Sequence, residues 1–550
     1  MRLIELLALV AALAACRSQS APSIPWNAGK AEHLAVRGPE RREYPITTRI
    51  ANMELRSPEG GSDGFGASIS LAAHTAVIGA PGAVGGGAAW VMDPRDPSKP
   101  WIRLEPPADP QVIGFGESVA VSPDGRWIAV GAPRSTVDGM PESGRVFLWE
   151  RIAGGCRYAQ SLISEPVIEG ALLGTSLAIG VLETPFGSAV RRSWTLLAGA
   201  PRVRVHMDVN RGVAFLWNHG LASSWKQSST LKWELPGGTR DSGDPSSPGE
   251  TAGERDGGLN TSLHHGQRGL SRGSALFGQS ADIVLSRDFS GALVGAPDAR
   301  TAVGHHAGGA SLYTPSREGW RSTPSTLLAG SLSQPLSHFG QAVGLAADLA
   351  VVGAPQASIP ALSAAGRVFV FRNLKVPNPT QGDKRRVLSA WMEEASLVAP
   401  RPGPAAAFGS SVAITAECLV AGSPQAAVDG TPSAGVAFTF QMVTPFQPSD
   451  PKWMPESELR SRDPAAAGRF GDQVKLTGDC MLVSEPRPGS GVVHLFIRAN
   501  DAWGLPMPGS EPASATEATT PQPETAAEPA ETGAASPATP ATSGQVPLPV

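Results

Sequence analysis

One segment recurs seven times along this chain of 550 residues, and such a repeat constrains a fold more strongly than composition does. Each copy begins with Phe-Gly, continues with an alternating strand, a tight turn and a second apolar strand, and closes with Gly-Ala-Pro. In four of the seven copies, 14 residues separate the leading position from the Gly of Gly-Ala-Pro or its replacement. The copies cover residues 65–81, 115–133, 173–201, 277–297, 339–355, 408–424 and 470–486.

Three copies depart from this pattern, and in the sixth, Gly-Ser-Pro at 422–424 replaces Gly-Ala-Pro. The third copy starts at Leu173-Gly174 rather than at Phe186-Gly187, because the earlier start keeps the usual distance from the preceding aromatic strand. We therefore expect residues 182–192 to lengthen a hairpin. In the seventh copy, Ser-Glu-Pro at 484–486 replaces Gly-Ala-Pro.

Each copy is followed by a polar loop, a Gly and a strand that carries aromatic residues, and often by a fourth strand that opens with Trp. Four short strands in roughly 50 to 70 residues are typical of one propeller blade, so we predict an all-β, seven-bladed β-propeller of four-stranded antiparallel blades. The leading Phe can pack between adjacent blades, and the Gly after it lets two backbones approach closely. The Trp residues expected to open fourth strands are Trp101, Trp225, Trp320, Trp391 and Trp453.

Composition agrees with this fold and argues against others. The 63 Gly and 51 Pro residues argue against a helical bundle, because both residue types weaken helix interiors. A hydrophobic content of 41% can fill a core, which argues against global disorder. The net charge of −4 indicates no surface for nucleic acid.

We expect the N-terminal segment to close the ring. Blade seven has three clear strands, but Pro506, Pro508 and Pro512 follow Trp503 and would end a fourth strand early. Residues 47–55 precede the first Phe-Gly just as the fourth strands precede the others. This segment is therefore predicted to supply the outer strand of blade seven, which removes the open seam of the ring.

The repeated residues resemble the FG-GAP repeat, known from the integrin α-chain propeller and from many bacterial surface proteins. The resemblance covers roughly residues 65–498 and implies a seven-bladed β-propeller, in agreement with the number of copies. Many integrin blades carry a calcium loop of closely spaced carboxylates between their first two strands. Turns such as 122–125 and 286–288 lack a second, properly spaced carboxylate. We therefore expect no calcium in these turns, no other metal and no cofactor.

The N-terminus looks like a bacterial export signal. The apolar run 6–15 is too short to span a bilayer but suits the core of a signal peptide. The sequence Leu-Ala-Ala-Cys that ends at Cys16 resembles a lipobox, which implies cleavage before Cys16 and acylation of its thiol. The alternative is an ordinary secretory signal with an incidental Cys. Three other cysteines remain, an odd number that cannot pair completely: Cys156, Cys418 and Cys480.

These features divide the chain into a lipoprotein signal peptide at 1–15, a flexible tether at 16–44, the propeller at 45–503 and a disordered tail at 504–550. Residues 236–272 lack hydrophobic periodicity and are predicted to be a disordered insertion between blades three and four. The tail is rich in Pro, Ala, Thr and Glu, and we expect a linker there, with partner binding as the alternative.

Few residues stand out as candidate sites. Asp138 and Asp429 lie in two similar loops and are candidates for ligand binding, although Asp-Gly followed by Pro is also ordinary turn chemistry. The His pairs at 264–265 and 305–306 have no Cys or carboxylate pattern beside them in the sequence. We therefore expect polar loops at both pairs rather than metal sites.

The sequence contains no nucleophile elbow, phosphate loop or His-Glu-x-x-His motif, and we predict that the chain is not an enzyme. The leading hypothesis is a propeller anchored by lipid in the bacterial cell envelope, in the outer membrane, that binds a protein or a polysaccharide as an adhesion or scaffold module. One alternative is a hydrolase with its active site at the propeller channel. Another is a subunit of an envelope assembly complex.

Replacing Cys16 by Ser should abolish lipid attachment, because a hydroxyl cannot form the thioether that carries the lipid. Palmitate labelling should disappear, and the chain should leave the membrane fraction. Cys156→Ser is the matched control and should change neither measurement. Unchanged labelling and fractionation of the Cys16→Ser chain would contradict the lipoprotein hypothesis.

Overall fold

The computed structural model describes residues 46–508, apart from residues 73, 205–210, 221–223, 234–274, 302, 378–386, 444–451 and 490. All regular elements in these ranges are β-strands. Among them there is accordingly no helix of the length and apolarity that a membrane span requires. The predicted signal peptide with Cys16, the tether and the insertion at 236–272 lie outside the described residues, as do residues 509–550 of the tail.

The strands form seven antiparallel blades of four strands each, which confirms the predicted propeller. Blade 1 contains β3 (Ser68–Ala72), β4 (Thr75–Ala80), β5 (Ala88–Met92) and β6 (Ile102–Leu104), and blade 2 contains β7 (Ser118–Val121), β8 (Trp127–Ala132), β9 (Arg145–Ile152) and β10 (Gly155–Leu162). Blade 3 contains β11 (Leu177–Phe186), β12 (Ala189–Ala200), β13 (Val213–His219) and β14 (Lys226–Lys232), and blade 4 contains β15 (Ser280–Leu285), β16 (Ser290–Ala296), β17 (Gly309–Tyr313) and β20 (Thr326–Leu328).

The last three blades follow the same order, except that the fourth strand of blade 7 comes from the start of the ring. Blade 5 contains β21 (Ala342–Ala346), β22 (Leu349–Ala354), β23 (Arg367–Pro377) and β24 (Val387–Leu397), and blade 6 contains β25 (Ser411–Ile414), β26 (Cys418–Ser423), β27 (Val436–Met442) and β28 (Trp453–Arg460). Blade 7 contains β29 (Val474–Leu476), β30 (Cys480–Glu485), β31 (Val492–Ala499) and β2 (Met53–Arg56).

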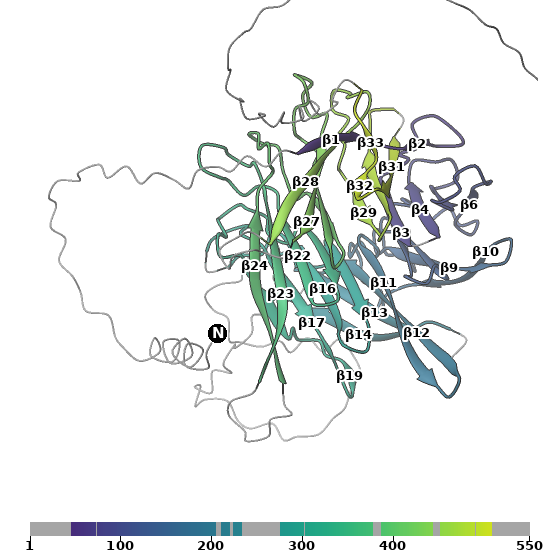
Figure 1. Cartoon of the computed structure of the whole chain (residues 1–550). Helices are drawn as coiled ribbons and strands as arrows, with labels where there is room; N and C mark the ends of the chain where they lie inside the picture. Colours follow the sequence, from purple (N-terminus) through teal and green to yellow (C-terminus); the bar gives the residue numbers. More distant parts are fainter. Residues whose placement is uncertain are drawn as a thin grey trace, which may run out of the picture. The chain divides into compact units, whose positions relative to one another are not determined.

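The first strand of every blade lies innermost. The strands β3, β7, β11, β15, β21, β25 and β29 contact one another in this order, and β29 contacts β3 in turn. Figure 1 shows this closure, with the purple strands of blade 1 beside the yellow strands of blade 7. The first strands therefore line the central channel, and each blade extends outward from it.

Seven hydrophobic clusters fill the junctions between neighbouring blades, one for each pair. At the junction of blades 1 and 2, Val77 and Val91 pack with Phe115, whose ring meets that of Phe147 edge-on at 5.5 Å between centroids. The leading Phe of six copies, and Leu173 in the third, are at most 1% exposed. The leading residue thus packs between blades as predicted, and truncating such a Phe to Ala typically costs about 3–5 kcal/mol.

Backbones of neighbouring blades also touch directly. A Cβ added to Gly79, in the Gly-Ala-Pro of blade 1, would lie 2.0 Å from the carbonyl oxygen of Gly116 in blade 2. The hydroxyl of Ser68 donates a hydrogen bond to the same oxygen at 2.8 Å. Four further junctions repeat both contacts, and their serine donors are Ser118, Ser176, Ser280 and Ser411. We name this arrangement of two Gly residues and one Ser the glycine lock.

The third copy begins at Leu173, as predicted. Leu173 forms a parallel bridge with Gly144 of blade 2, and Phe115 forms the same bridge with Gly87 of blade 1. The extra residues lengthen the hairpin of β11 and β12, which stays paired up to Phe186 opposite Ala189.

The N-terminal segment closes the ring, but its two halves join different blades. The strand β2 pairs antiparallel with β31, which confirms the predicted outer strand of blade 7. The strand β1 (Thr47–Ile50) instead runs parallel to β28 at the outer edge of blade 6 and is covered by β33 (Leu505–Pro506). Between β1 and β2 the side-chain oxygen of Asn52 accepts a hydrogen bond from the Ile497 N–H at 2.7 Å, which holds the crossing between the two blades.

Two predicted strand starts are wrong. Trp391 lies inside β24 rather than at its start. Trp320 does not open the fourth strand of blade 4, because it lies in a separate hairpin of β18 (Pro315–Ser316) and β19 (Gly319–Trp320). The fourth strand is β20, which pairs with β17. Beside this hairpin, the Ser229 hydroxyl of blade 3 donates a hydrogen bond to the Trp320 carbonyl at 3.1 Å.

Deleting residues 47–56 should sharply lower the thermal stability, because it removes the outer strand of blade 7 and uncovers the edge of blade 6. We expect the melting temperature to fall by roughly 5–10 °C, a change of several kcal/mol for a ring of this size. Differential scanning calorimetry measures it. Deleting residues 541–550 is the control of equal length. A melting temperature equal to that of the control deletion would contradict the role of the segment in closure.

Candidate functional site

The propeller has two ends with different connections. Because successive strands reverse direction, the turns between strands 1 and 2 and between strands 3 and 4 of each blade emerge at one end, the turn face. The loops between strands 2 and 3 and the connections to the next blade emerge at the other end, the loop face. Functional side chains are expected on these faces, because they lie on connections held by a rigid frame.

Asp138 and Asp429 both lie on the loop face, exposed, in blades 2 and 6. Each has a left-handed backbone, with φ of 51° and 50°, and each is followed by Gly in a tight turn closed by a β-bridge. Asp429 forms an ion pair with Arg460 at 3.1 Å. The two blades are not neighbours, so the structure does not bring the two carboxylates together, and their geometry is that of turn residues.

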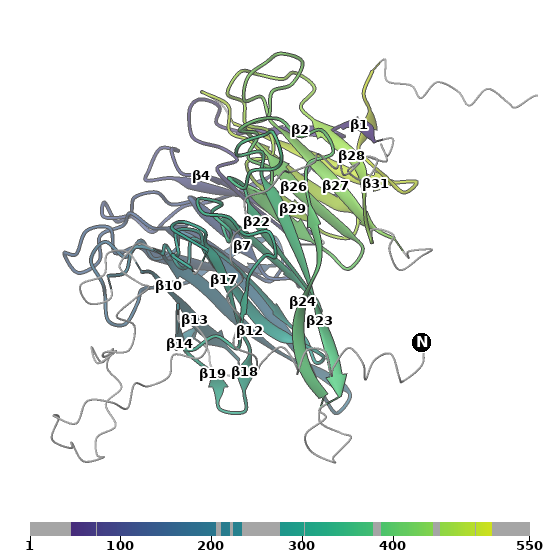
Figure 2. The same cartoon turned by 90° about the vertical axis from the view of Figure 1, so that its left-hand side faces the viewer.

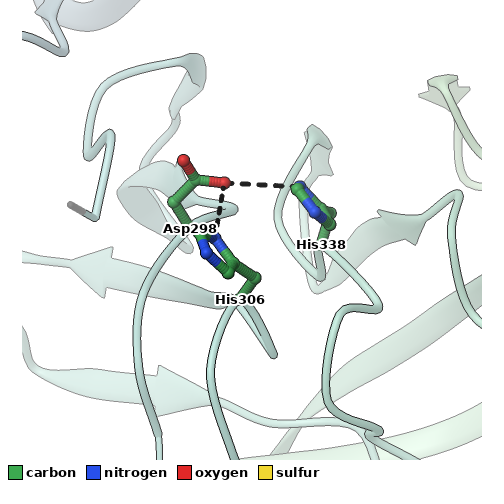
Figure 3. Close-up of side chains that lie close together, drawn as sticks. All are labelled: Asp298, His306 and His338. Carbon is green, nitrogen blue, oxygen red and sulfur yellow. Dashed lines mark ion pairs between the residues drawn. The ribbon is translucent and has the colours of Figure 1, made fainter. Parts of the chain in front are cut away.

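A cluster that sequence reasoning missed lies on the loop face at the junction of blades 4 and 5. Asp298 follows the Gly-Ala-Pro of blade 4, His306 lies in the same loop, and His338 is the residue before the Phe-Gly of blade 5. Asp298 Oδ1 lies 3.3 Å from His306 Nδ1 and 3.4 Å from His338 Nδ1, and Figure 3 shows the three side chains converging. The two imidazole rings are stacked at 5.7 Å between centroids.

The electrostatics of this cluster favour a neutral imidazole at His338. Burial lowers the pKa of His338, the neighbouring His306 lowers it further, and Asp298 only partly opposes them. In the part of the chain that the structure describes, this is the one group of three His, Cys, Asp or Glu side chains placed to hold a metal ion. The pair at 305–306 was predicted to be only a polar loop because no carboxylate stands beside it, but the structure supplies Asp298 from the same loop. The pair at 264–265 lies outside the described residues.

A cavity of about 320 Å³ opens on the turn face between blades 1 and 2. Its polar wall includes His74, Asp124, Arg126 and Arg151. Arg151 already donates hydrogen bonds to the carbonyl of His74 and the hydroxyl of Thr75, and Arg126 pairs with a carboxylate of its own blade. Both cations thus have partners within the protein.

A hydrolase at the channel would need acid–base groups on the inner strands. The innermost strands carry Asp282 and Lys475, and the carboxylate of Asp282 accepts hydrogen bonds from the N–H groups of Ile283 and Leu345 at 2.9 and 2.8 Å. Burial raises the pKa of Asp282, and Lys475 opposes this rise.

The described His–carboxylate pair with the shortest separation is fully buried in blade 7. His494 Nε2 lies 2.7 Å from Glu485 Oε2, and both side chains are at most 1% exposed. Arg487 forms a second ion pair with Glu485 at 2.8 Å. Glu485 stands where five of the other copies have the Ala of Gly-Ala-Pro, and His494 stands where blade 2 has Phe147. The pair therefore belongs to the core of the blade and is closed to a substrate.

Comparisons with known proteins leave the family open. Neither a protein-family model nor a curated protein sequence matches the chain. A chain of the "Crystal Structure of Mitotic Checkpoint Complex" is 10% identical with a TM-score of 0.41, over 86% of this chain and 98% of its own length. The periplasmic gluconolactonase of Pseudomonas aeruginosa is 12% identical with a TM-score of 0.37, over 77% and 91%. The Aleuria aurantia lectin is 9% identical with a TM-score of 0.30, over 72% and 95%. Similarities this low carry no argument about function.

The buried pair of Glu485 and His494 makes the stability of the folded chain depend on pH. Burial alone would raise the pKa of Glu485, but hydrogen bonds and charges from His494 and Arg487 outweigh it and lower the pKa below its ordinary value of 4.5. A lowered carboxyl pKa stabilises the folded chain above about pH 4.5, and this contribution is lost as the pH falls through the lower folded value.

Thermal unfolding between pH 3 and pH 7 tests this effect. The wild-type melting temperature should fall more steeply below pH 4.5 than that of Glu485→Gln, because the amide does not titrate. Glu417→Gln, on an exposed turn, is the control and should follow the wild-type curve. Identical acid slopes for the wild type and Glu485→Gln would show that the pair does not contribute.

Proposed function

We propose that this chain is an exported bacterial lipoprotein of the FG-GAP type whose propeller binds a protein partner at the cell envelope and catalyses no reaction. Cys16 would carry the lipid and the tether would hold the ring at the outer membrane. The observation that carries the binding role is a set of hairpins that extend from three neighbouring blades on the turn face. We name this set the hairpin rim: the hairpins of β11–β12, β18–β19 and β23–β24.

Two hairpins of the rim expose apolar side chains. At the end of the β11–β12 hairpin, Phe186 is 63% exposed and Val190 is 59% exposed. In the β23–β24 hairpin, Leu374 and Met392 are 44% and 56% exposed. Figure 2 shows the hairpins of blades 4 and 5 extending side by side. Apolar side chains exposed on a protruding hairpin are free to contact a partner.

Charged groups around Phe186 complete a surface suited to a protein. The guanidinium of Arg191 lies 4.5 Å from the centroid of the Phe186 ring, and Arg192 pairs with Glu183 at 2.7 Å. Aromatic and Arg side chains supply most of the binding free energy in protein interfaces. This combination supports a protein partner.

The burial of eight Trp side chains weighs against a polysaccharide as the ligand. A sugar-binding platform needs an exposed aromatic face, but eight Trp side chains are at most 6% exposed. They are Trp90, Trp127, Trp149, Trp194, Trp217, Trp225, Trp453 and Trp503. These eight Trp side chains pack the blades and offer no face to a sugar.

The proposal covers two cases: a free binder, and a subunit that is bound to its partner in a fixed ratio within an envelope assembly. Affinity purification of the tagged, lipidated chain from membranes separates them, because a subunit recovers one partner in equal amount. The double variant Phe186→Ser/Val190→Ser should reduce recovery of that partner at least tenfold, while Val84→Ser should not. Val84 is the matched control because it is 88% exposed on the loop face.

Equal recovery by the rim variant and the control would contradict binding through the hairpin rim. A purified chain that hydrolyses envelope material, with activity lost in Asp282→Asn, would instead favour the channel hydrolase. Circular dichroism of each variant checks that the propeller is intact.

A further inference from the structure

The cluster of Asp298, His306 and His338 has a geometry that its own hydrogen bonding does not explain. Separations of 3.3 and 3.4 Å between Asp298 Oδ1 and the two Nδ1 atoms exceed the usual range for a hydrogen bond. The Nδ1 atom of His306 is shielded from solvent and has no hydrogen-bond partner. A shielded polar atom without a hydrogen-bond partner marks a place where an ion or a water can bind.

The same separations fit a tetrahedral metal ion. Zinc bound at about 2.0–2.1 Å places neighbouring ligand atoms roughly 3.3–3.4 Å apart, as tetrahedral geometry requires. The two distances from Asp298 Oδ1 already have this length, and all three ligand atoms lie within 4.8 Å of one another.

The loops that carry the three side chains are held in place without a metal. The N–H of His338 donates a hydrogen bond to the carbonyl of His306 at 3.1 Å, and the N–H of Leu336 donates to the carbonyl of His305 at 3.0 Å. The N–H of Asp298 donates to the carbonyl of Ala275 at 3.3 Å. The backbone therefore holds the three ligands in position before a metal binds, which lowers the free-energy cost of binding.

Other junctions have the same backbone without these ligands. His306 and His338 have left-handed backbones, with φ of 48° and 53°, and so do Ala364 and Ala407 at the corresponding positions one blade further on. The residue that corresponds to Asp298 at that junction is Gln356. The repeat thus explains the backbone conformation at this junction, but it does not explain why two His and one Asp converge there.

We propose that Asp298, His306 and His338 bind a zinc ion, or a similar divalent transition metal, that links the loop of blade 4 to blade 5. Two imidazole nitrogens select zinc over calcium, which prefers oxygen ligands. Three protein ligands leave a fourth position, and the side chain of His306 is 45% exposed, so solvent or a partner group can reach the ion. This site is on the loop face and is independent of the hairpin rim.

Zinc titration of the purified full chain, followed by calorimetry, tests the proposal. We expect one zinc ion per chain and at least a hundredfold weaker binding in His306→Ala and in His338→Ala. His305→Ala is the matched control, because His305 is the exposed neighbour of His306. Saturating zinc should also raise the melting temperature of the wild type and of the control, but not of the two ligand variants.

Cobalt(II) in place of zinc reports the coordination geometry of the site. Cobalt added to the metal-free chain should develop the strong visible absorption of a tetrahedral site, which His338→Ala should lose. The absence of zinc binding to the wild type would overturn the proposal. Equal affinity in the ligand variants and in His305→Ala would also overturn it, because the zinc would then be bound elsewhere, for example at His264 or His265.

Discussion

The propeller depends on the direct approach of two backbones at the junctions between blades. At the glycine lock the Gly of Gly-Ala-Pro faces the carbonyl of the Gly after the next leading Phe, with no room for a side chain, and Ser68 or its counterpart bonds to that carbonyl. The close approach brings the inner strands together, and the seven interblade clusters pack outward from them. Both contacts are made by short local motifs, which explains why these motifs recur while the connecting loops vary.

The seventh copy shows how the ring tolerates a departure from this rule. Ser484 replaces the Gly, and Glu485 replaces the following Ala. The carboxylate of Glu485 is buried, but His494 and Arg487 pair with it inside the blade. A buried ion pair seldom adds net stability, but removing one partner is costly. Blade 7 therefore relies on β2 and on its paired charges where other blades rely on small residues.

A rigid ring leaves its connections free to carry function. The turn face carries the hairpin rim, whose apolar ends suit a protein partner, and the loop face carries the cluster of Asp298, His306 and His338. The two surfaces lie at opposite ends of the blades, so binding at one leaves the other accessible. The proposed metal would add a coordination link at one junction, where hydrophobic packing and backbone hydrogen bonds already hold the blades.

The amino-acid sequence by itself determined the seven blades, the start of the third copy at Leu173 and the closure through β2, because each depends on motifs at short, regular spacing. It could not determine that β1 joins blade 6, since a strand of four residues carries no signal for its partner. Nor could it show that Asp298 and His306 meet His338, which lies 32 residues after His306 and belongs to the next blade. Only the packing of two blades brings such side chains together, because convergence across a junction depends on the relative position of separate sheets and not on any period within one of them.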